Sequence, residues 1–590
     1  MTLLGASRFA FALASVHAQD GFDWTALEPS TALNFTSCYG RHRCARLSAP
    51  LDWTNPAEPA RVSIAIVALP ATVPQDDPSF GGTIIVNPGG PSVSGVGYVL
   101  GYGQWLQDTA SSEAAKYEIL SFDPRGVGST TPRADCFDGD EIARAAYNLE
   151  DRAMGPLDEE AAVRRKLAQL QAYGRLCETS RAHKVDRIFE HMSTSDVARD
   201  MVEMVDKLEA LRGKPATGGR AELRSVNGTD KTPRINYWGY SYGTILGNYF
   251  ASMFPGRVGR MMLEAVVDVQ DYYSGAWANS LVDTQASLQY FWDACFTARS
   301  KCAIYRSTDA SPADVEKRVR GFLHQLDLAP AAWVTSAGNI VTISMDDVSW
   351  IIFENLYSSD LLFDTLARTL DEAMSGNFST VAARYPRPFK TGTCQANPTA
   401  YTWNFDALYG ISCGDAVSLL GNATSSSIAA YVKSQKRDSP DFGAAFARVQ
   451  TPCRGWKIRP QNRFEGPWTT PPHDSRLVEG KPAAPLLFVS ALRDPVTPLA
   501  NARSMAESHP GARVLVQDTV SHGALPSPSK CRLAHIRRYF ATGEVPAEET
   551  LCKTDCKVWE ECQGRGLAPR HASLSGSALW APSGINEHGI

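Results

Sequence analysis

A serine stands at the centre of GYSYG, residues 239–243, which matches the pattern G-x-S-x-G. A serine hydroxyl becomes a good nucleophile only when a neighbouring base removes its proton. The glycines permit a sharp turn that lifts the hydroxyl out of the edge of a sheet, because larger side chains would collide there. The motif therefore predicts that Ser241 is a nucleophile. The alternative is a glycine-rich turn with an incidental serine.

A base and an acid follow the serine, each after a later apolar run. His522 lies in VSHG, residues 520–523, and can accept the serine proton. Asp494 lies in LRDPV, residues 492–496, and can hold the imidazole in the required tautomer and stabilise its cation. Asp-Pro is also common in turns, which is the alternative interpretation of Asp494. The order serine, aspartate, histidine predicts a catalytic triad that works through an acyl-enzyme.

The tetrahedral intermediate of such a reaction needs hydrogen-bond donors for its negatively charged oxygen. The backbone N–H of Tyr242, at the start of a helix, is one candidate. The second is the N–H of Gly90 in the turn PGGP, residues 88–91, which follows an earlier apolar run. We therefore expect an oxyanion hole made by Gly90 and Tyr242. A plain tight turn is the alternative for Gly90.

Short apolar runs bounded by glycine and proline precede each of these residues, as buried parallel strands do. They alternate with helical patterns, of which 194–211 and 244–254 are the clearest. Such alternation predicts a mostly parallel sheet with helices on both faces, which is the α/β-hydrolase fold. The runs cover 61–69, 83–86, 117–122, 234–238, 261–267, 485–489 and 513–516.

At 590 residues the chain exceeds what one hydrophobic core usually fills, so an insertion is expected. The strand–helix rhythm stops near residue 270 and resumes near 480. We therefore predict that 40–270 and 481–550 form the hydrolase core and that 271–480 form a large, mainly helical cap or lid. A signal peptide over 1–18 and a loose tail over 563–590 complete the predicted organisation.

Several segments resemble the secreted tripeptidyl aminopeptidases, which belong with the prolyl aminopeptidases in the α/β-hydrolase superfamily. The region from about 430 to 545 resembles the C-terminal region of these enzymes. The resemblance implies a serine exopeptidase that removes short peptides or single residues from free N-termini, with a peptide substrate and with no metal or other cofactor. The segments are Asn87–Gly95, Ser121–Pro132, Tyr237–Gly247, Arg257–Asp268 and Pro485–Leu499.

Two positions depart from the pattern of that family. The family has Gly-Gly-Pro-Gly at the oxyanion turn, where this chain has Ser92 after the proline, and it has Asp-Gly where this chain has Glu264 and Ala265. An exopeptidase must bind the ammonium group of its substrate, and ligands lie at the carboxyl ends of the strands in such sheets. Glu264 is therefore a candidate for ammonium recognition. The alternative is a carboxylate that stabilises the turn.

Three further features predict an exported protein. An apolar run over 9–16 ends near Ala18, as a signal peptide with its cleavage site does. Thirteen cysteines, some in close pairs and none at zinc-finger spacing, favour disulfides over metal sites and leave one thiol over. The close pairs are Cys38 with Cys44, Cys295 with Cys302 and Cys556 with Cys562, and the N-glycosylation sequons are at Asn34, Asn227, Asn377 and Asn422.

Composition excludes other classes of partner. The formal net charge is −5 and the chain has no basic run, which argues against nucleic acid or an anionic membrane surface. No apolar stretch approaches the roughly 20 residues of a membrane-spanning helix. A carboxylesterase or lipase-like hydrolase stays open, because fold and triad do not determine the acyl substrate. A catalytically inactive binding protein is the third class, although the motif carries no disabling change.

Overall fold

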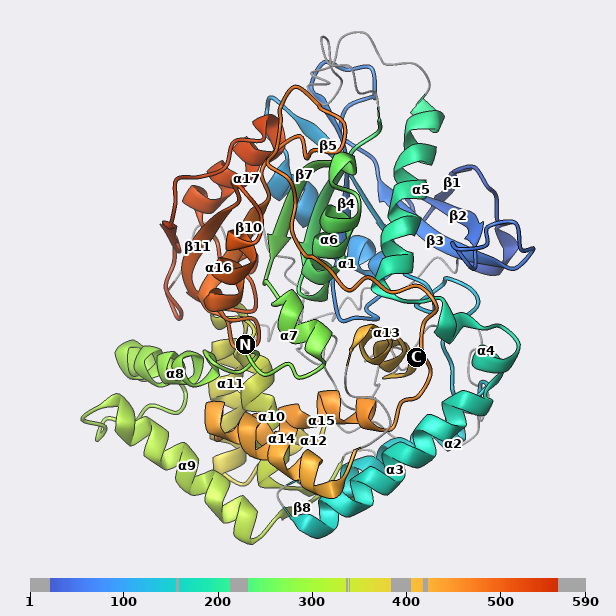
Figure 1. Cartoon of the computed structure of the whole chain (residues 1–590). Helices are drawn as coiled ribbons and strands as arrows, with labels where there is room; N and C mark the ends of the chain where they lie inside the picture. The colour runs from blue at the N-terminus through green and yellow to red at the C-terminus, as the bar shows by residue number, and fades with distance from the viewer. Residues whose placement is uncertain are drawn as a thin grey trace, which may run out of the picture.

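The computed structural model describes residues 22–154, 157, 159–212, 232–335, 338, 340–383, 405–417 and 423–560. Its centre is a ten-stranded sheet in the order β1-β2-β3-β5-β4-β6-β7-β10-β11-β12 (Figure 1). The signal peptide predicted over 1–18 and the tail predicted over 563–590 lie outside the described residues.

The sheet is mixed at one edge and parallel elsewhere. The neighbours β1, β2, β3 and β5 pair antiparallel, and every pairing from β5 across to β12 is parallel. This arrangement, with helices between the parallel strands, confirms the predicted α/β-hydrolase fold. The strands are β1 (Thr36–Cys38), β2 (His42–Pro50), β3 (Arg61–Leu69), β4 (Phe80–Asn87), β5 (Lys116–Phe122), β6 (Ile235–Tyr240), β7 (Val258–Glu264), β10 (Leu487–Arg493), β11 (Arg513–Val520) and β12 (Thr550–Lys553).

Each face of the sheet has its own hydrophobic core, because successive side chains of a strand point to opposite faces. In β4, Ile85 belongs to the core under α5 and α6, whereas Ile84 belongs to the core under α1 and α17. The apolar stripe that predicts a helix over 194–211 is buried in α5 from Val197 to Leu208, whereas Leu211 is exposed. The covering helices are α1 (Gly95–Ala110), α5 (Thr194–Arg212), α6 (Tyr242–Met253), α16 (Leu499–Glu507) and α17 (Lys530–Thr542).

A second layer of helices lies beyond the carboxyl ends of the parallel strands, in the lower half of Figure 1. Most of it comes from the chain between β7 and β10, but α3, from between β5 and α5, packs against α14. We call the described residues of 141–179 and 269–454 the cap layer. Its helices are α2 (Glu141–Ala153), α3 (Glu160–Thr179), α7 (Val269–Ser274), α8 (Thr284–Ala298), α9 (Pro312–Leu328), α10 (Met345–Asn355), α11 (Ser359–Met374), α12 (Ser379–Ala382), α13 (Phe405–Asp415), α14 (Ser425–Asp438) and α15 (Gly443–Gln450), with the hairpin β8 (Ala331–Val334) and β9 (Ile340–Ile343).

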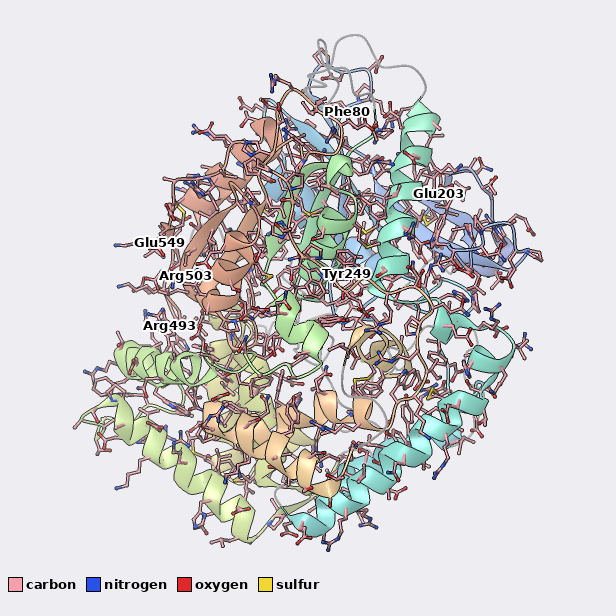
Figure 2. The ribbon with its side chains drawn as sticks, viewed as in Figure 1. Phe80, Glu203, Tyr249, Arg493, Arg503 and Glu549 are labelled. Atoms are coloured by element: carbon pink, nitrogen blue, oxygen red, sulfur yellow. A yellow bond between two sulfur atoms is a disulfide. The ribbon has the colours of Figure 1, made fainter. Side chains whose placement is uncertain are left out.

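The chain returns from the cap layer to the sheet through residues 455–486. Phe464 and Trp468 in this segment place their ring centroids 5.8 and 6.0 Å from that of Tyr249 in α6, near the middle of the molecule (Figure 2). The segment is therefore packed on the core. The remaining short helices are α4 (Arg181–Lys184), η1 (Trp24–Ala26), η2 (Ile188–Glu190), η3 (Pro255–Arg257), η4 (Arg299–Lys301) and η5 (Thr451–Arg454).

Five disulfides join ten of the eleven described cysteines. Two of the predicted close pairs, Cys38–Cys44 and Cys295–Cys302, are confirmed, and Cys562 lies outside the described residues. Among the described residues no helix is long and apolar enough to cross a membrane. The other disulfides are Cys136–Cys177, Cys413–Cys453 and Cys531–Cys552.

Candidate active site

Ser241 lies at the sharp turn between β6 and α6. Its φ of 56° and ψ of −125° place a non-glycine residue in a sparsely populated backbone region. A Cβ on Gly239 would lie 2.2 Å from the carbonyl oxygen of Gly243, so the first glycine of the motif is required by the turn. The N–H of Ser241 donates to the carbonyl of Glu264 over 3.0 Å. These features form the strained strand-to-helix turn, or elbow, that the sequence motif predicts around Ser241.

The turn that contains Gly90 lies directly against this elbow. A Cβ on Gly89 would lie 2.8 Å from the Cβ of Ser241 and 2.9 Å from the amide nitrogen of Tyr242. The N–H of Tyr242 belongs to the first turn of α6, where backbone donors have no partner within the helix. Gly90 and Tyr242 line one cavity together with Ser241. The structure thus brings both predicted oxyanion donors to the serine.

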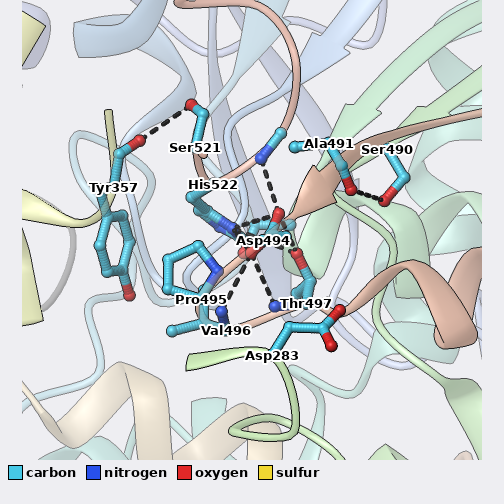
Figure 3. A network of polar contacts seen from close by, with 12 residues as sticks. Asp283, Tyr357, Ser490, Ala491, Asp494, Pro495, Val496, Thr497, Ser521 and His522 are labelled. Carbon is cyan, nitrogen blue, oxygen red and sulfur yellow. Dashed lines mark hydrogen bonds and ion pairs between the residues drawn. The ribbon is translucent and has the colours of Figure 1, made fainter. Parts of the chain in front are cut away.

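Asp494, just after β10, and His522, just after β11, meet at the carboxyl ends of these two strands, as Figure 3 shows. Both carboxylate oxygens of Asp494 lie 3.2 Å from Nδ1 of His522, and the two side chains are 0% and 1% exposed. Oδ1 accepts the N–H groups of Val496 and Thr497 over 3.0 and 2.8 Å. Oδ2 accepts Thr497 Oγ1 and the N–H of Gly523, each over 2.7 Å. The carboxylate is therefore held in one orientation toward the imidazole.

Two tyrosines enclose His522 between the sheet and the cap layer. The hydroxyl of Tyr240 donates to the carbonyl of His522, and the two rings are 5.1 Å apart. On the other side the carbonyl of Tyr357 accepts the N–H of His522 over 3.0 Å and the hydroxyl of Ser521 over 2.9 Å. The Tyr357 ring is 5.0 Å from the imidazole. The position of the imidazole therefore depends on both layers.

The cavity beside Ser241 joins the elements of the predicted site. Thr497 lines it and places Oγ1 3.2 Å from Nδ1 of His522, so one residue of the lining contacts the predicted base. Its volume of about 20 Å³ holds roughly one water and is too small for the acyl group of a peptide. The lining residues are Gly90, Ser241, Tyr242, Ile245, Val267, Tyr272, Trp277, Ser280, Phe446, Val496 and Thr497.

Glu264 is fully buried and its carboxylate is already engaged. It accepts the N–H groups of Ala524 and Leu525 over 2.9 and 2.7 Å and Nε1 of Trp238 over 3.0 Å. Burial raises the pKa of Glu264, and the nearby charge of Arg532 opposes that rise. These contacts describe a carboxylate that stabilises a turn. They do not support the expectation that Glu264 binds the ammonium of a substrate.

Arg532 holds the same turn from its opposite side. Its guanidinium donates to the carbonyl of Ala524 and, over 2.9 Å, to Oε1 of Gln517. Two buried side chains therefore hold the backbone that follows His522. Glu264 accepts its N–H groups, and Arg532 donates to the carbonyl of Ala524. Glu264 is a positioning residue for the loop that carries the histidine.

The change Glu264→Gln tests this structural role. We expect it to lower the free energy of unfolding by about 2 kcal/mol, because the charge-assisted bonds weaken and Arg532 loses its counter-charge. Urea unfolding measures the loss. Turnover of free and of N-blocked substrates should then fall by the same factor. A loss confined to substrates with a free amine would restore the role in ammonium binding.

The departures at Ser92 and Ala265 place side chains where backbone geometry favours glycine. Their φ angles are 84° and 57°, inside the left-handed region. A glycine at either position would adopt such an angle without a clash from Cβ, which gives a physical reason for the glycines of the resembling family. The backbone at Ser92 and at Ala265 is therefore more strained than it would be with glycine at the same positions.

Ala265→Gly is expected to raise the free energy of unfolding by about 1 kcal/mol, because the left-handed conformation costs alanine about that much. Thermal or urea unfolding measures the gain. Ala251→Gly, in the last turn of α6, is a matched control that should instead destabilise the protein. If both variants lost stability equally, the turn at Ala265 would not be strained.

Asp415, which the sequence analysis did not identify, supports the wall of the cavity. It is buried at the end of α13 and accepts the N–H and Oγ1 of Thr194 over 3.0 and 2.5 Å and the hydroxyl of Tyr272 over 2.8 Å. Thr194 Oγ1 in turn lies 2.6 Å from the hydroxyl of Tyr242. Because Tyr242 and Tyr272 both line the cavity, Asp415 couples the cap layer to the residues beside Ser241.

This group predicts a pH dependence of stability. Burial raises the pKa of Asp415 to about 6 from 3.8, so the folded state binds the proton more tightly than the unfolded state does. The resulting stabilisation is complete below pH 4 and is lost as the pH rises through 6. Relative to Asp415→Asn, the wild type should lose up to about 3 kcal/mol between pH 4 and pH 7. Urea unfolding at several pH values measures the difference, and parallel curves would contradict it.

Comparison with known proteins places this site in context. Residues 439–552, which include Asp494 and His522, match the family described as TAP-like protein. The chain is 25% identical to a tripeptidyl aminopeptidase of Streptomyces lividans over 86% of this chain and 83% of that protein. It is 30% identical to the serine protease Hip1 of Mycobacterium tuberculosis over 38% of this chain and 36% of that protein. It is also 30% identical to a carboxylesterase B of the same species over 27% and 28% of the two chains.

Proposed function

We propose that this chain, a serine hydrolase of the α/β-hydrolase fold, is a secreted exopeptidase that releases tripeptides from the free N-termini of peptides. The observation that carries the proposal is the similarity to a tripeptidyl aminopeptidase, which extends over 86% of this chain. It therefore includes the cap layer as well as the sheet. The disulfides and the predicted signal peptide support export.

In the proposed mechanism Ser241 Oγ attacks the carbonyl carbon of the scissile peptide bond while His522 accepts the hydroxyl proton. Asp494 stabilises the imidazolium. The N–H groups of Tyr242 and Gly90 donate to the oxyanion of the tetrahedral intermediate. His522 then protonates the departing amine and leaves an acyl-enzyme. Water, deprotonated by His522, attacks the ester and releases the tripeptide.

The closed cap layer supports exopeptidase rather than endopeptidase activity. Ser241 is only 6% exposed, and residues from the cap layer line the cavity above it. An endopeptidase substrate would extend out of this cavity in both directions and would need two openings. A chain that ends in the cavity needs only one. The apolar lining favours uncharged side chains in the acyl group. Its small volume means that the cap layer moves when substrate binds.

Carboxylesterase activity is the second candidate. The similarity to a carboxylesterase over 27% of this chain and the apolar cavity both favour it. The two functions share the chemistry at Ser241 and differ in the acyl group and the leaving group. Only substrate turnover separates them.

A panel of fluorogenic mono-, di- and tripeptide amides, each with a free or blocked amine, tests the proposal beside short- and long-chain esters. We expect free-amine tripeptide amides to react fastest and Ser241→Ala to be inactive on all of them. Strong turnover of esters without cleavage of any free-amine amide would establish the esterase instead. Equal turnover of blocked and free amides would contradict exopeptidase activity.

A further inference from the structure

Tyr357 carries a buried hydroxyl with no hydrogen-bond partner among the described residues. The residue is 5% exposed and lies between α10 and α11 in the cap layer. A buried donor that is left unpaired costs stability, since the phenol gives up its hydrogen bond to water on folding. Phenylalanine would fill the same space without that cost. The described residues therefore give this hydroxyl no role in the packing of the fold.

The surroundings of Tyr357 place its ring beside the proposed base, with the hydroxyl at the end of the ring away from the backbone (Figure 3). The backbone of Tyr357 is fixed by the two hydrogen bonds from Ser521 and His522, and its ring packs 5.0 Å from the imidazole (Figure 3). The ring centroid of Phe353 lies 5.9 Å from that of Tyr357 and 6.2 Å from that of Phe446, and Phe446 lines the cavity. Tyr357 thus lies beside His522 and is connected to the cavity lining through the ring of Phe353.

The phenol is a donor under all working conditions. Burial, together with the nearby carboxylates of Asp494 and Glu354, raises the pKa of Tyr357 well above 10. The hydroxyl therefore keeps its proton, and its natural ligand is a hydrogen-bond acceptor. In a peptide substrate the backbone carbonyl oxygens are such acceptors.

The position of Tyr357 relative to the cavity indicates which carbonyl it serves. The cavity beside Ser241 and the oxyanion donors receives the acyl group, and Tyr357 is not among the described residues that line it. His522 must reach the departing nitrogen in order to protonate it. The residue that follows the scissile bond therefore passes next to the imidazole, where Tyr357 lies.

We propose that the hydroxyl of Tyr357 donates a hydrogen bond to the carbonyl oxygen of the first residue of the leaving peptide. This inference rests on the proposed peptidase function and adds a specificity residue on the leaving-group side of the site. Tyr357 would favour peptide leaving groups over other amines and esters. It would also link binding of the leaving peptide to the loop that carries His522.

Tyr357→Phe tests the inference with two substrates that share one acyl group. One has a peptide leaving group, and the other has aminocoumarin, which lacks the carbonyl in question. Tyr431→Phe is the matched control, because its hydroxyl is also buried without a partner among the described residues but lies on α14 against the Leu157 and Val163 cluster. The melting temperature of each variant is measured alongside kcat/KM.

We expect Tyr357→Phe to lower kcat/KM about five- to tenfold on the peptide substrate and to leave the aminocoumarin substrate unchanged. Its melting temperature should not fall, because an unpaired buried hydroxyl is removed. Tyr431→Phe should leave both activities unchanged. An equal loss on both substrates, or no loss on either, would overturn the inference while the peptidase function stands. A wild-type protein that cleaves no peptide would overturn both.

Discussion

Replacing Ser241 by alanine is expected to lower kcat by about a million-fold on every substrate that the wild type hydrolyses. The reason is that no other group at the elbow can form the acyl-enzyme, and the triad acts as a unit. The residual rate should come from substrate binding and from the oxyanion donors Gly90 and Tyr242 alone. Burst and steady-state kinetics with an activated substrate measure the loss.

The fold of this variant should be intact. Alanine keeps the Cβ of serine and the same positive φ, and the Ser241 N–H that donates to Glu264 is backbone. The melting temperature is therefore expected to stay close to that of the wild type. Ser252→Ala, at a partly buried serine near the other end of α6, is the matched control and should keep full activity. Turnover by Ser241→Ala above one thousandth of the wild-type rate would show that another nucleophile operates.

Asp494→Asn is expected to lower kcat about ten-thousand-fold at neutral pH. An amide cannot stabilise the imidazolium, and its NH₂ group favours the wrong tautomer of His522. Because the carboxylate also accepts four bonds from the neighbouring loops, the free energy of unfolding should fall by about 2 kcal/mol. Steady-state kinetics and urea unfolding measure the two effects.

Asp283 supplies the control for this change. Its half-buried carboxylate lies close to Pro495 and Asp494 in Figure 3 but accepts a bond from the backbone of Leu499. Asp283→Asn should therefore keep activity within a few-fold of the wild type. If the Asp283 and Asp494 variants lost activity equally, the loss would come from removing a negative charge near the site and not from removing the contact between Asp494 and His522.

Local patterns predict the sheet and the polar residues at its carboxyl edge. Ser241, Asp494 and His522 each follow a short buried strand, and parallel strands bring such positions to one edge even when 250 residues separate them. The glycines at 89 and 239 are equally visible, because their role depends on backbone geometry close to each of them. The placement of these residues could therefore be inferred before the structure was known.

The cap layer contains what these patterns miss. Tyr357 and Asp415 contact the site through hydrogen bonds to residues far away in the chain, and no local motif marks either of them. The segment 141–179 follows β5 in the sequence, yet α3 packs on α14. The end of a strand makes Glu264 a candidate for ammonium binding, but the sequence does not show that its carboxylate accepts the N–H groups of the turn at 524–525. Such contacts depend on how the layers pack, which periodicity does not encode.

Labelling with a fluorophosphonate tests the central claim most directly, because an activated serine hydroxyl displaces fluoride from such a reagent and becomes phosphonylated. The wild type should take up one equivalent, and mass spectrometry of the digested protein should place it on Ser241. Ser241→Ala should take up none, and Asp494→Asn should react far more slowly. A label on another serine, or no label on a folded and active wild type, would contradict the account.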